Sequence, residues 1–283
     1  MEAIKGILPR LGLETTYSDM SPREREQFKV DCYNKSQGNR NEEDGYDCPI
    51  CKNKGHVFKL VDEEDGSFRQ VFADCKCAEV RRSILRMKKS GLKNIIKDYT
   101  FDKFVDSDQW QKTIKQAAVE YAKNPEGWFT IGGQSGAGKT HICTAICREF
   151  LLAGRNVMYM LWRDEVVKLK GLANNPEEYG KLIDKYKKAD ILYIDDLFKT
   201  GKGPDGDIQR PTGADVNVAF EIINYRSNDP NLLTIISSEC TEDDLLDIDE
   251  AVGGRIIEKA GKNAFSIAKN RARNYRLRKS VTL

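Results

Sequence analysis

The sequence has no hydrophobic run long enough to cross a membrane. Its longest strictly apolar stretch is residues 157–162 (VMYMLW), whereas a transmembrane helix needs about 20 residues. The amino-terminal segment MEAIKGILPRLGL is interrupted by Pro9 and Arg10 and offers no small-residue cleavage site, so we expect no signal peptide. These absences predict a cytoplasmic protein without a membrane partner.

The chain also lacks a net charge that would predict a partner by itself. Its 46 Lys and Arg balance 44 Asp and Glu to a charge of +2, but the charges are segregated. Residues 76–97 hold eight basic side chains and one acid, residues 255–283 hold nine and one, and residues 239–250 hold seven acids and no base. Such segregation permits basic surfaces that neutralise phosphates, although solvated helix faces would explain each run as well.

A disulfide framework is not expected either, because no secretory signal accompanies the eight cysteines. Cys48 and Cys51 form one close pair (CPIC), and Cys75 and Cys77 form another (CKC), one residue shorter than the usual spacing. Two such pairs around a hairpin can bring four thiolates to one tetrahedral Zn²⁺. His56 is an alternative fourth ligand, and reduced cysteines without metal are the remaining alternative. A region this short buries little core, so zinc would supply its folding energy.

The composition changes twice along the chain, which indicates three regions. Residues 1–47 form a helical and linker region, in which Ser21-Pro22-Arg23-Glu24 predicts a helix start and residues 34–47 a linker. Residues 48–98 form the cysteine module, with predicted hairpin strands at 56–61 and 68–72, and a basic, helical connector.

Residues 99–283 alternate between strand and helix patterns. The 40% of hydrophobic residues in the whole chain is enough for a buried core. One predicted strand ends at Ile131, and three more span residues 156–161, 191–194 and 232–236. Predicted helices span residues 110–121, 139–153 and 214–227, and further helical stretches follow the strand at 156–161 up to residue 188. Alternation of this kind predicts the α/β class, with a mostly parallel sheet covered by helices on both faces. We find no internal repeat.

A phosphate-binding loop lies between a predicted strand and a predicted helix. It matches the pattern G-x-x-x-x-G-K-[ST] in full and consists of Gly133, Gln134, Ser135, Gly136, Ala137, Gly138, Lys139 and Thr140, followed by His141. Its backbone N–H groups and the helix dipole would cradle the phosphates of ATP. Lys139 would reach the β- and γ-phosphates, and the Thr140 hydroxyl would bind Mg²⁺.

Two carboxylates follow the apolar strand at residues 191–194. Asp195 and Asp196 would lie at the edge of the sheet that holds the phosphate loop, because the carboxyl ends of parallel strands share one edge. Asp195 would support Mg²⁺, and Asp196 would orient and activate the attacking water. The sequence therefore predicts ATP binding, and hydrolysis follows as a further prediction.

Several later motifs, in their order and spacing, resemble helicase loaders of the DnaC/DnaI type. They are residues 191–197 (ILYIDDL), 234–239 (TIISSE), 248–256 (IDEAVGGRI) and 274–277 (NYRL). These loaders belong to the AAA+ ATPases, and transposition ATPases of the IstB type are close neighbours. The resemblance covers residues 95–280, and the cysteine module with residues 99–104 resembles the segment before the ATPase domain in DnaI-type and prophage loaders.

The resemblance implies roles for three further residues. Arg255 resembles the arginine finger that enters the ATP site of a neighbouring subunit, and an ordinary surface arginine is the alternative. Arg276 resembles a second sensor of the phosphates within the same subunit. At the first sensor many relatives have Asn, where this chain has Ser237-Ser238-Glu239. Ser238 is the candidate there, and the identity of the sensing residue stays open.

The resemblance implies an ATP-dependent loader that binds a replicative helicase of the DnaB type and self-associates through its ATP sites. Its cysteine module would bear on the helicase. Lys202 and Arg210, in the polar loop at 200–213, would meet single-stranded DNA if the loop faces a central channel, and a loop without a ligand is the alternative. A transposition-accessory ATPase and a nucleotide-gated adaptor with negligible hydrolysis are the alternative functions.

Overall fold

The computed structural model describes residues 17–89, 92, 95–201 and 210–278. The chain falls into two compact units, Met1–Ala78 and Glu79–Leu283. Within the described residues, no helix has the length and apolar character needed to cross a membrane.

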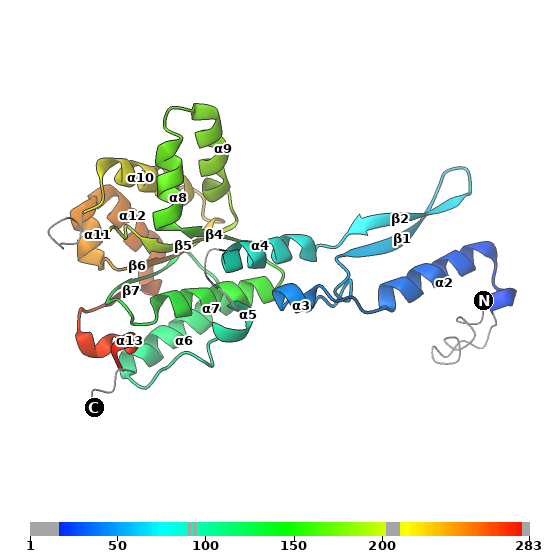
Figure 1. Cartoon of the computed structure of the whole chain (residues 1–283), viewed down its shortest axis with the longest axis horizontal. Helices are drawn as coiled ribbons and strands as arrows, with labels where there is room; N and C mark the ends of the chain where they lie inside the picture. Colours follow the sequence, from blue (N-terminus) through cyan, green and yellow to red (C-terminus); the bar gives the residue numbers. More distant parts are fainter. Residues whose placement is uncertain (1–16, 90–91, 93–94, 202–209, 279–283) are drawn as a thin grey trace. The chain divides into compact units, whose positions relative to one another are not determined.

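The smaller unit contains helices followed by an antiparallel hairpin (Figure 1). Its elements are the 3₁₀ turn η2 (Tyr17–Asp19), α2 (Pro22–Lys35), α3 (Asn41–Asp44), β1 (His56–Asp62) and β2 (Phe68–Asp74). The predicted hairpin is confirmed, since β1 and β2 pair antiparallel with His56 opposite Asp74. The predicted helix start is confirmed as well. The Ser21 side chain accepts from the Glu24 N–H, and the Ser21 N–H donates to the Glu24 carboxylate at 2.7 Å.

The polar stretch at 34–47 is folded, so the expectation of a linker there was wrong. The Asn34 side chain brackets the backbone of Phe58, donating to its carbonyl at 2.8 Å and accepting from its N–H at 3.1 Å. The Gly38 N–H donates to the Lys52 carbonyl at 2.6 Å. Hydrogen bonds from a side chain and from the backbone order this segment, and the apolar pattern of the sequence carries no sign of them.

The larger unit alternates strands and helices. Its elements are α4 (Cys77–Lys89), which begins in the smaller unit, α5 (Ile95–Asp98), α6 (Gln109–Lys123), β3 (Phe129–Gly133), α7 (Lys139–Leu152), β4 (Val157–Leu161), α8 (Trp162–Gly171), α9 (Pro176–Lys187), β5 (Ile191–Leu197), α10 (Gly213–Ser227), β6 (Leu233–Ser238), α11 (Glu242–Ile248), α12 (Glu250–Ala260), the turn η3 (Gly261–Asn263), β7 (Ala264–Ile267), the turn η4 (Arg271–Arg273) and α13 (Tyr275–Arg278).

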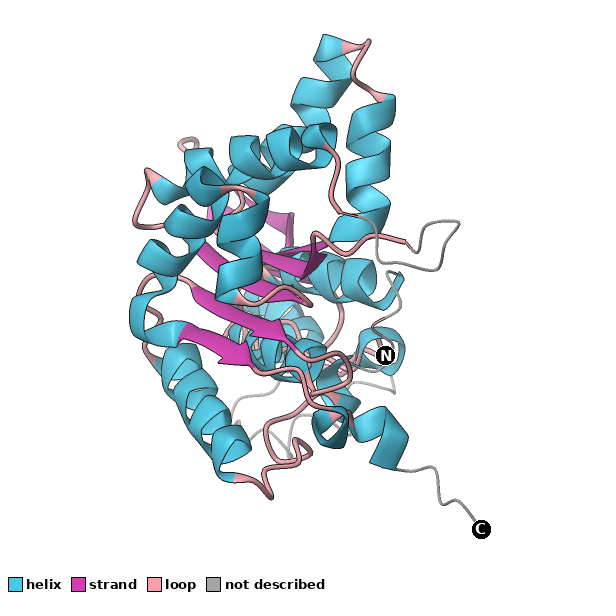
Figure 2. Ribbon diagram, turned by 90° about the vertical axis from the view of Figure 1, so that its left-hand side faces the viewer, coloured by secondary structure: helices cyan, strands magenta, loops and turns pink. Residues whose placement is uncertain are grey.

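The five strands of the larger unit form one parallel sheet in the order β4-β5-β6-β3-β7. Figure 2 shows the sheet between two layers of helices. On one face α7 packs against β4, β5 and β6, with α6 beside it, and on the other α8 and α12 pack against the sheet. The predicted α/β class is confirmed. The edge strand β7 was not predicted, because its four residues carry no clear apolar run.

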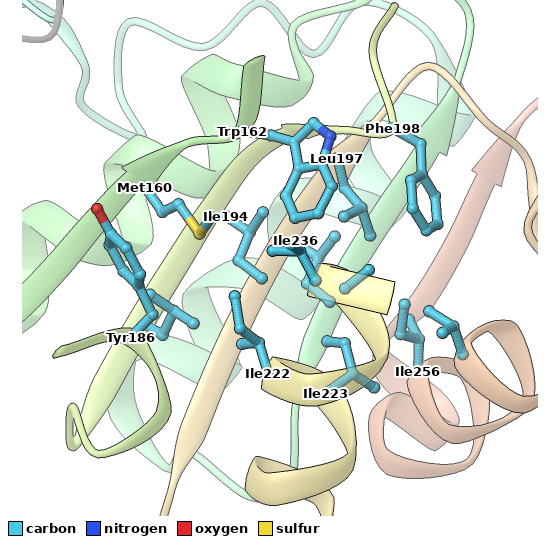
Figure 3. Packing of buried hydrophobic residues seen from close by; sticks show 14 of the residues in the cluster. Met160, Trp162, Tyr186, Ile194, Leu197, Phe198, Ile222, Ile223, Ile236 and Ile256 are labelled. Atoms are coloured by element: carbon cyan, nitrogen blue, oxygen red, sulfur yellow. The ribbon is translucent and has the colours of Figure 1, made fainter. Parts of the chain in front are cut away.

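The main core lies between the sheet and the layer of α8, α9, α10 and α12 (Figure 3). Met160, Ile194 and Ile236 project from β4, β5 and β6 and meet Ile222 of α10 and Ile256 of α12, each at most 1% exposed. Burying one such side chain stabilises the fold by about 1.5–3 kcal/mol. This core fixes the position of β5. The carboxyl end of β5 and the loop that follows β3 form the candidate site.

Candidate ATP and zinc sites

The phosphate loop folds as its glycines require. It joins the end of β3 to the start of α7, and Gly133, Gly136 and Gly138 have φ values of 99°, 72° and 91°. A Cβ on Gly133 would lie 2.0 Å from the carbonyl oxygen of Ile267, and one on Gly136 would lie 2.1 Å from Oδ1 of Asn274. The backbone carbonyl of Ile267 leaves no room for a side chain at Gly133, and the positive φ values favour glycine at all three positions, so the loop can turn its backbone toward one cavity.

Lys139 is buried within this loop and is only 6% exposed. Its ammonium donates to the carbonyl oxygens of Gly133 and Gln134, each at 2.9 Å. Burial lowers the pKa of Lys139, while the carboxylates of Glu239 and Asp196 act in the opposite direction. A buried cation at the first turn of α7 is suited to binding an anion.

Thr140 and Asp195 meet next to the loop, as their sequence positions predict. The Thr140 hydroxyl donates to Oδ1 of Asp195 at 3.1 Å, and the Asp195 side chain is buried. Tyr193 donates to Oδ1 and Tyr159 to Oδ2, each at 2.9 Å, and Ser237 also donates to Oδ1. An aligned carboxylate beside a hydroxyl is the oxygen donor set that Mg²⁺ prefers, so these two residues fit the ion.

Tyr159 and Tyr193 were not predicted as site residues. Burial and the nearby Asp195 carboxylate raise the pKa of both phenols, so both remain hydrogen-bond donors near neutral pH. From sequence they read as two apolar-strand residues, one on β4 and one on β5. The parallel pairing that places Tyr159 opposite Tyr193 gives them a common target, and single-strand patterns contain no sign of that pairing.

Asp196 follows directly and faces the same cavity as Lys139. Its backbone is left-handed, with φ of 59°, and the pairing of β5 with β6 is irregular here. Its N–H donates to Oγ of Ser237 at 3.2 Å, and its carboxylate accepts from the Lys199 ammonium at 2.8 Å. The irregularity turns the Asp196 side chain away from the buried Asp195 and into the cavity.

Glu239 and Lys199 complete the wall of the cavity. Glu239 accepts from the Ser135 hydroxyl of the phosphate loop at 2.9 Å and lies 3.2 Å from the Lys199 ammonium. Burial raises the pKa of Glu239, but Ser135 and Lys199 outweigh it and lower the pKa overall. Lys199 lies outside every sequence motif, so its presence here is a finding of the structure.

The cavity beside the phosphate loop has a volume of about 320 Å³. Its far side is closed by the carboxy-terminal segment, where the Tyr275 N–H donates to the Gly136 carbonyl at 2.9 Å. Arg276 lines the cavity, as its predicted role requires. His141 lines it too, and its Nε2 lies 2.9 Å from the Thr100 carbonyl oxygen.

Two predicted site residues lie elsewhere. Ser238 is 1% exposed, and its hydroxyl donates to the Leu197 carbonyl at 2.7 Å and does not line the cavity. Arg255 lies on α12, where its guanidinium donates to the Ala251 carbonyl at 2.8 Å and covers the Phe220 ring at 5.3 Å. It is separate from the phosphate cavity of its own chain.

The four predicted zinc ligands converge in the smaller unit. The sulfur atoms of Cys48, Cys51, Cys75 and Cys77 all lie within 4.8 Å of one another, and all four residues are buried. Cys48 and Cys75 are 3.7 Å apart at sulfur, and Cys51 and Cys77 are 3.6 Å apart. Tetrahedral zinc with bonds of about 2.3 Å requires about 3.8 Å between sulfurs. The cluster therefore has the geometry to hold one zinc ion.

The backbone around Cys51 supports a thiolate. The Gly55 N–H donates to the Cys51 sulfur at 3.2 Å, and left-handed Lys52 and Asn53 form the turn between them. Burial opposes ionisation, but this N–H and the neighbouring thiols lower the pKa of Cys51 to about 7. His56, the alternative ligand, instead contacts the Tyr33 hydroxyl and lies outside the cluster.

Comparison with known proteins identifies the family that this chain resembles. A family model described as IstB-like ATP binding protein matches residues 71–239, more than half of the chain. The uncharacterized protein YqaM of Bacillus subtilis is 28% identical over 255 residues, which are 75% of this chain and 79% of that protein. The phage-like element PBSX protein XkdC of the same organism is 30% identical over 225 residues, with the same two shares.

The chain is also similar, over a shorter segment, to a replicative helicase loader. The replicative helicase loader DnaC of Escherichia coli is 26% identical over 113 residues, 38% of this chain and 46% of that protein. A crystal structure titled as the DnaC helicase loader superposes with a TM-score of 0.48 at 19% identity, covering 62% of this chain and 99% of that one. The predicted resemblance to DnaC-type helicase loaders and to ATP-binding proteins of the IstB type is confirmed.

Proposed function

The chain belongs to the family of IstB-like ATP binding proteins, and we propose that it is an ATP-dependent helicase loader. It binds a replicative helicase of the DnaB type and helps to place it on single-stranded DNA when replication begins. The observation that carries the proposal is the presence in one chain of a phosphate-loop cavity and a separate unit with a four-cysteine cluster. The similarity to DnaC of Escherichia coli supports the same function.

The phosphate cavity would bind and hydrolyse ATP. Lys139 would approach the β- and γ-phosphates, and Thr140 and Asp195 would hold Mg²⁺, which would neutralise charge on the phosphates. Asp196 accepts a hydrogen bond from a water molecule and orients it toward the γ-phosphorus. The water oxygen bonds to phosphorus as the bond to the β-phosphate oxygen breaks, and ADP and phosphate leave.

Subunit contacts would complete the site. Arg276 lines the cavity of its own chain, where its guanidinium would contact the phosphates. Arg255 lies away from that cavity, as a residue that acts on a neighbouring subunit must. A planar cation supplied in this way stabilises charge that develops on the γ-phosphate. Self-association would therefore depend on ATP.

The remaining partners belong to other parts of the chain. Zinc would stabilise the fold of the smaller unit, and this unit would take part in binding the helicase. Arg210 is exposed and available to DNA phosphates, whereas Lys202, its predicted companion, lies outside the described residues.

A transposition-accessory ATPase is the second candidate function, and the IstB-like family description favours it. Pull-down with the purified helicase and, separately, with a transposase encoded in the same genome distinguishes the two. Retention of the helicase alone supports the loader. Retention of the transposase alone would replace it with the second candidate.

A nucleotide-gated adaptor with negligible hydrolysis is the third possibility. A single-turnover ATP assay of the full chain, with Asp196→Asn as control, tests it. The loader with ATPase activity predicts release of phosphate that the variant lacks. Background rates in both proteins would leave an adaptor that binds ATP without hydrolysing it.

A further inference from the structure

Lys199 links the two functional carboxylates of the cavity wall. Its ammonium lies 2.8 Å from Oδ2 of Asp196 and 3.2 Å from Oε1 of Glu239, and its side chain is 33% exposed. Glu239 in turn is bonded to Ser135 of the phosphate loop. Lys199 therefore pairs with the carboxylate expected to orient water and is connected to the loop expected to hold phosphate.

The backbone directs Lys199 into the cavity. Asp196 and Phe198 both have φ of 59°, a left-handed conformation that is unfavourable for a non-glycine residue. The Lys199 N–H donates to the Asp196 carbonyl at 2.9 Å, which closes the turn. The Phe198 ring is 3% exposed and packs edge-on against Trp162 with centroids 5.6 Å apart. Core packing thus maintains a turn that local preference opposes.

The end of β6 provides no spare hydroxyl proton for a phosphate. A serine hydroxyl has one proton to donate. That of Ser237 is donated to Asp195, and that of Ser238 to the Leu197 carbonyl. The next residue, Glu239, is an acid and repels phosphate when ionised. Of the side chains from the β5 and β6 ends that line the cavity, Lys199 is the cation.

An incoming triphosphate competes for this cation. Lys139 and Lys199 face the same cavity; the Lys139 ammonium donates to two backbone carbonyls, and the Lys199 ammonium pairs with two carboxylates. A γ-phosphate offers charged oxygen acceptors of the same strong class as the Asp196 and Glu239 carboxylates, so it can exchange with them as a partner of the Lys199 ammonium. ADP has no phosphate at that position. A cation that bonds only the terminal phosphate therefore distinguishes ATP from ADP.

We propose that Lys199 is the γ-phosphate sensor of this chain. When ATP binds, its ammonium moves from Asp196 to a γ-phosphate oxygen, and this frees the Asp196 carboxylate to orient water. When ADP is bound, the ammonium stays on Asp196 and Glu239. The inference rests on the proposed ATP site and adds a residue that reports which nucleotide occupies it.

Nucleotide affinities of the full chain test this sensor. Dissociation constants are measured with Mg²⁺ for ADP and for the non-hydrolysable analogue β,γ-methylene-ATP in wild type, Lys199→Met and Lys199→Gln. Both variants should lose about 10- to 100-fold in affinity for the analogue, the effect of one charge-assisted hydrogen bond, and less than about threefold for ADP. Lys199→Arg should recover part of the loss. Lys168→Met is the matched control, because Lys168 forms an i,i+3 ion pair with Glu165 on α8, outside the cavity.

Phosphorus NMR of the bound analogue distinguishes a direct contact between Lys199 and the γ-phosphate from a general effect of its positive charge. The γ-phosphorus resonance should shift between wild type and Lys199→Met, and the α-phosphorus resonance should stay. The proposal for Lys199 would be overturned if the ratio of the affinity for the analogue to the affinity for ADP were the same in wild type and in both variants. This includes the case in which a variant loses affinity equally for both nucleotides. Absence of binding of either nucleotide to wild type would instead refute the ATP site itself.

Discussion

Replacement of Cys51 by Ser should remove zinc from the chain and unfold its smaller unit. The four sulfurs already have the spacing of a tetrahedral site, with 3.6 and 3.7 Å in the two close pairs. Apart from these cysteines, the buried hydrophobic side chains among the described residues of this unit are Val30 and Tyr46. At about 1.5–3 kcal/mol each they contribute about 3–6 kcal/mol, whereas structural zinc contributes about 10–16 kcal/mol in zinc-finger peptides. Zinc binding would therefore stabilise this unit more than its apolar core does.

Metal analysis and limited proteolysis measure the effect. Freshly purified wild-type protein, never exposed to chelator, should carry about one zinc per chain, and Cys51→Ser should carry less than about a tenth of that. Cys32→Ser is the matched control, because Cys32 lies on α2 outside the cluster. This variant protein should keep its zinc. Proteolysis should cut the smaller unit only in the Cys51 variant. Less than half an equivalent in wild type, or equal zinc in Cys51→Ser, would refute the reasoning.

Three further predictions concern the ATPase unit. Lys139→Ala should abolish binding of a fluorescent ADP analogue, because it removes the buried cation of the loop, and an unchanged dissociation constant would contradict this. Arg226→Met should lower the free energy of unfolding by about 3–5 kcal/mol in urea titrations, since the buried guanidinium bonds Thr234 and four backbone carbonyls; a loss below about 1 kcal/mol would be too small. Burial lowers the pKa of His141, so as the pH falls from about 7 to about 5 the unfolded state takes up a proton before the folded state does, and the free energy of unfolding decreases. His141→Gln should make the free energy of unfolding depend less on pH over this range. An unchanged pH dependence would contradict this prediction.

The parts of the site that were predictable are those contained in one local segment. The phosphate loop needs its glycines and Lys139 within eight residues, and the hairpin of the cysteine module has its turn residues between two apolar runs. Asp195 and Asp196 follow one strand directly. In each case neighbouring residues specify the geometry, so the pattern alone predicts the position.

The parts that were not predictable depend on contacts between distant segments. Tyr159 reaches Asp195 only because β4 pairs with β5 in one register. Lys199 enters the cavity through two left-handed residues that no propensity predicts. The edge strand β7 forms because β3 offers it a partner. The functional boundaries expected at residues 47 and 98, and the role of Arg255 on a neighbouring subunit, stay predictions.

Size-exclusion chromatography of the chain with its host's replicative helicase tests the central claim most directly. The mixture is run with ATP and without nucleotide, and Lys139→Ala serves as the variant without a functional ATP site. The loader predicts co-elution of the two proteins in at least one state, with an ATP dependence that the variant lacks. Separate elution of chain and helicase in both states would contradict the account.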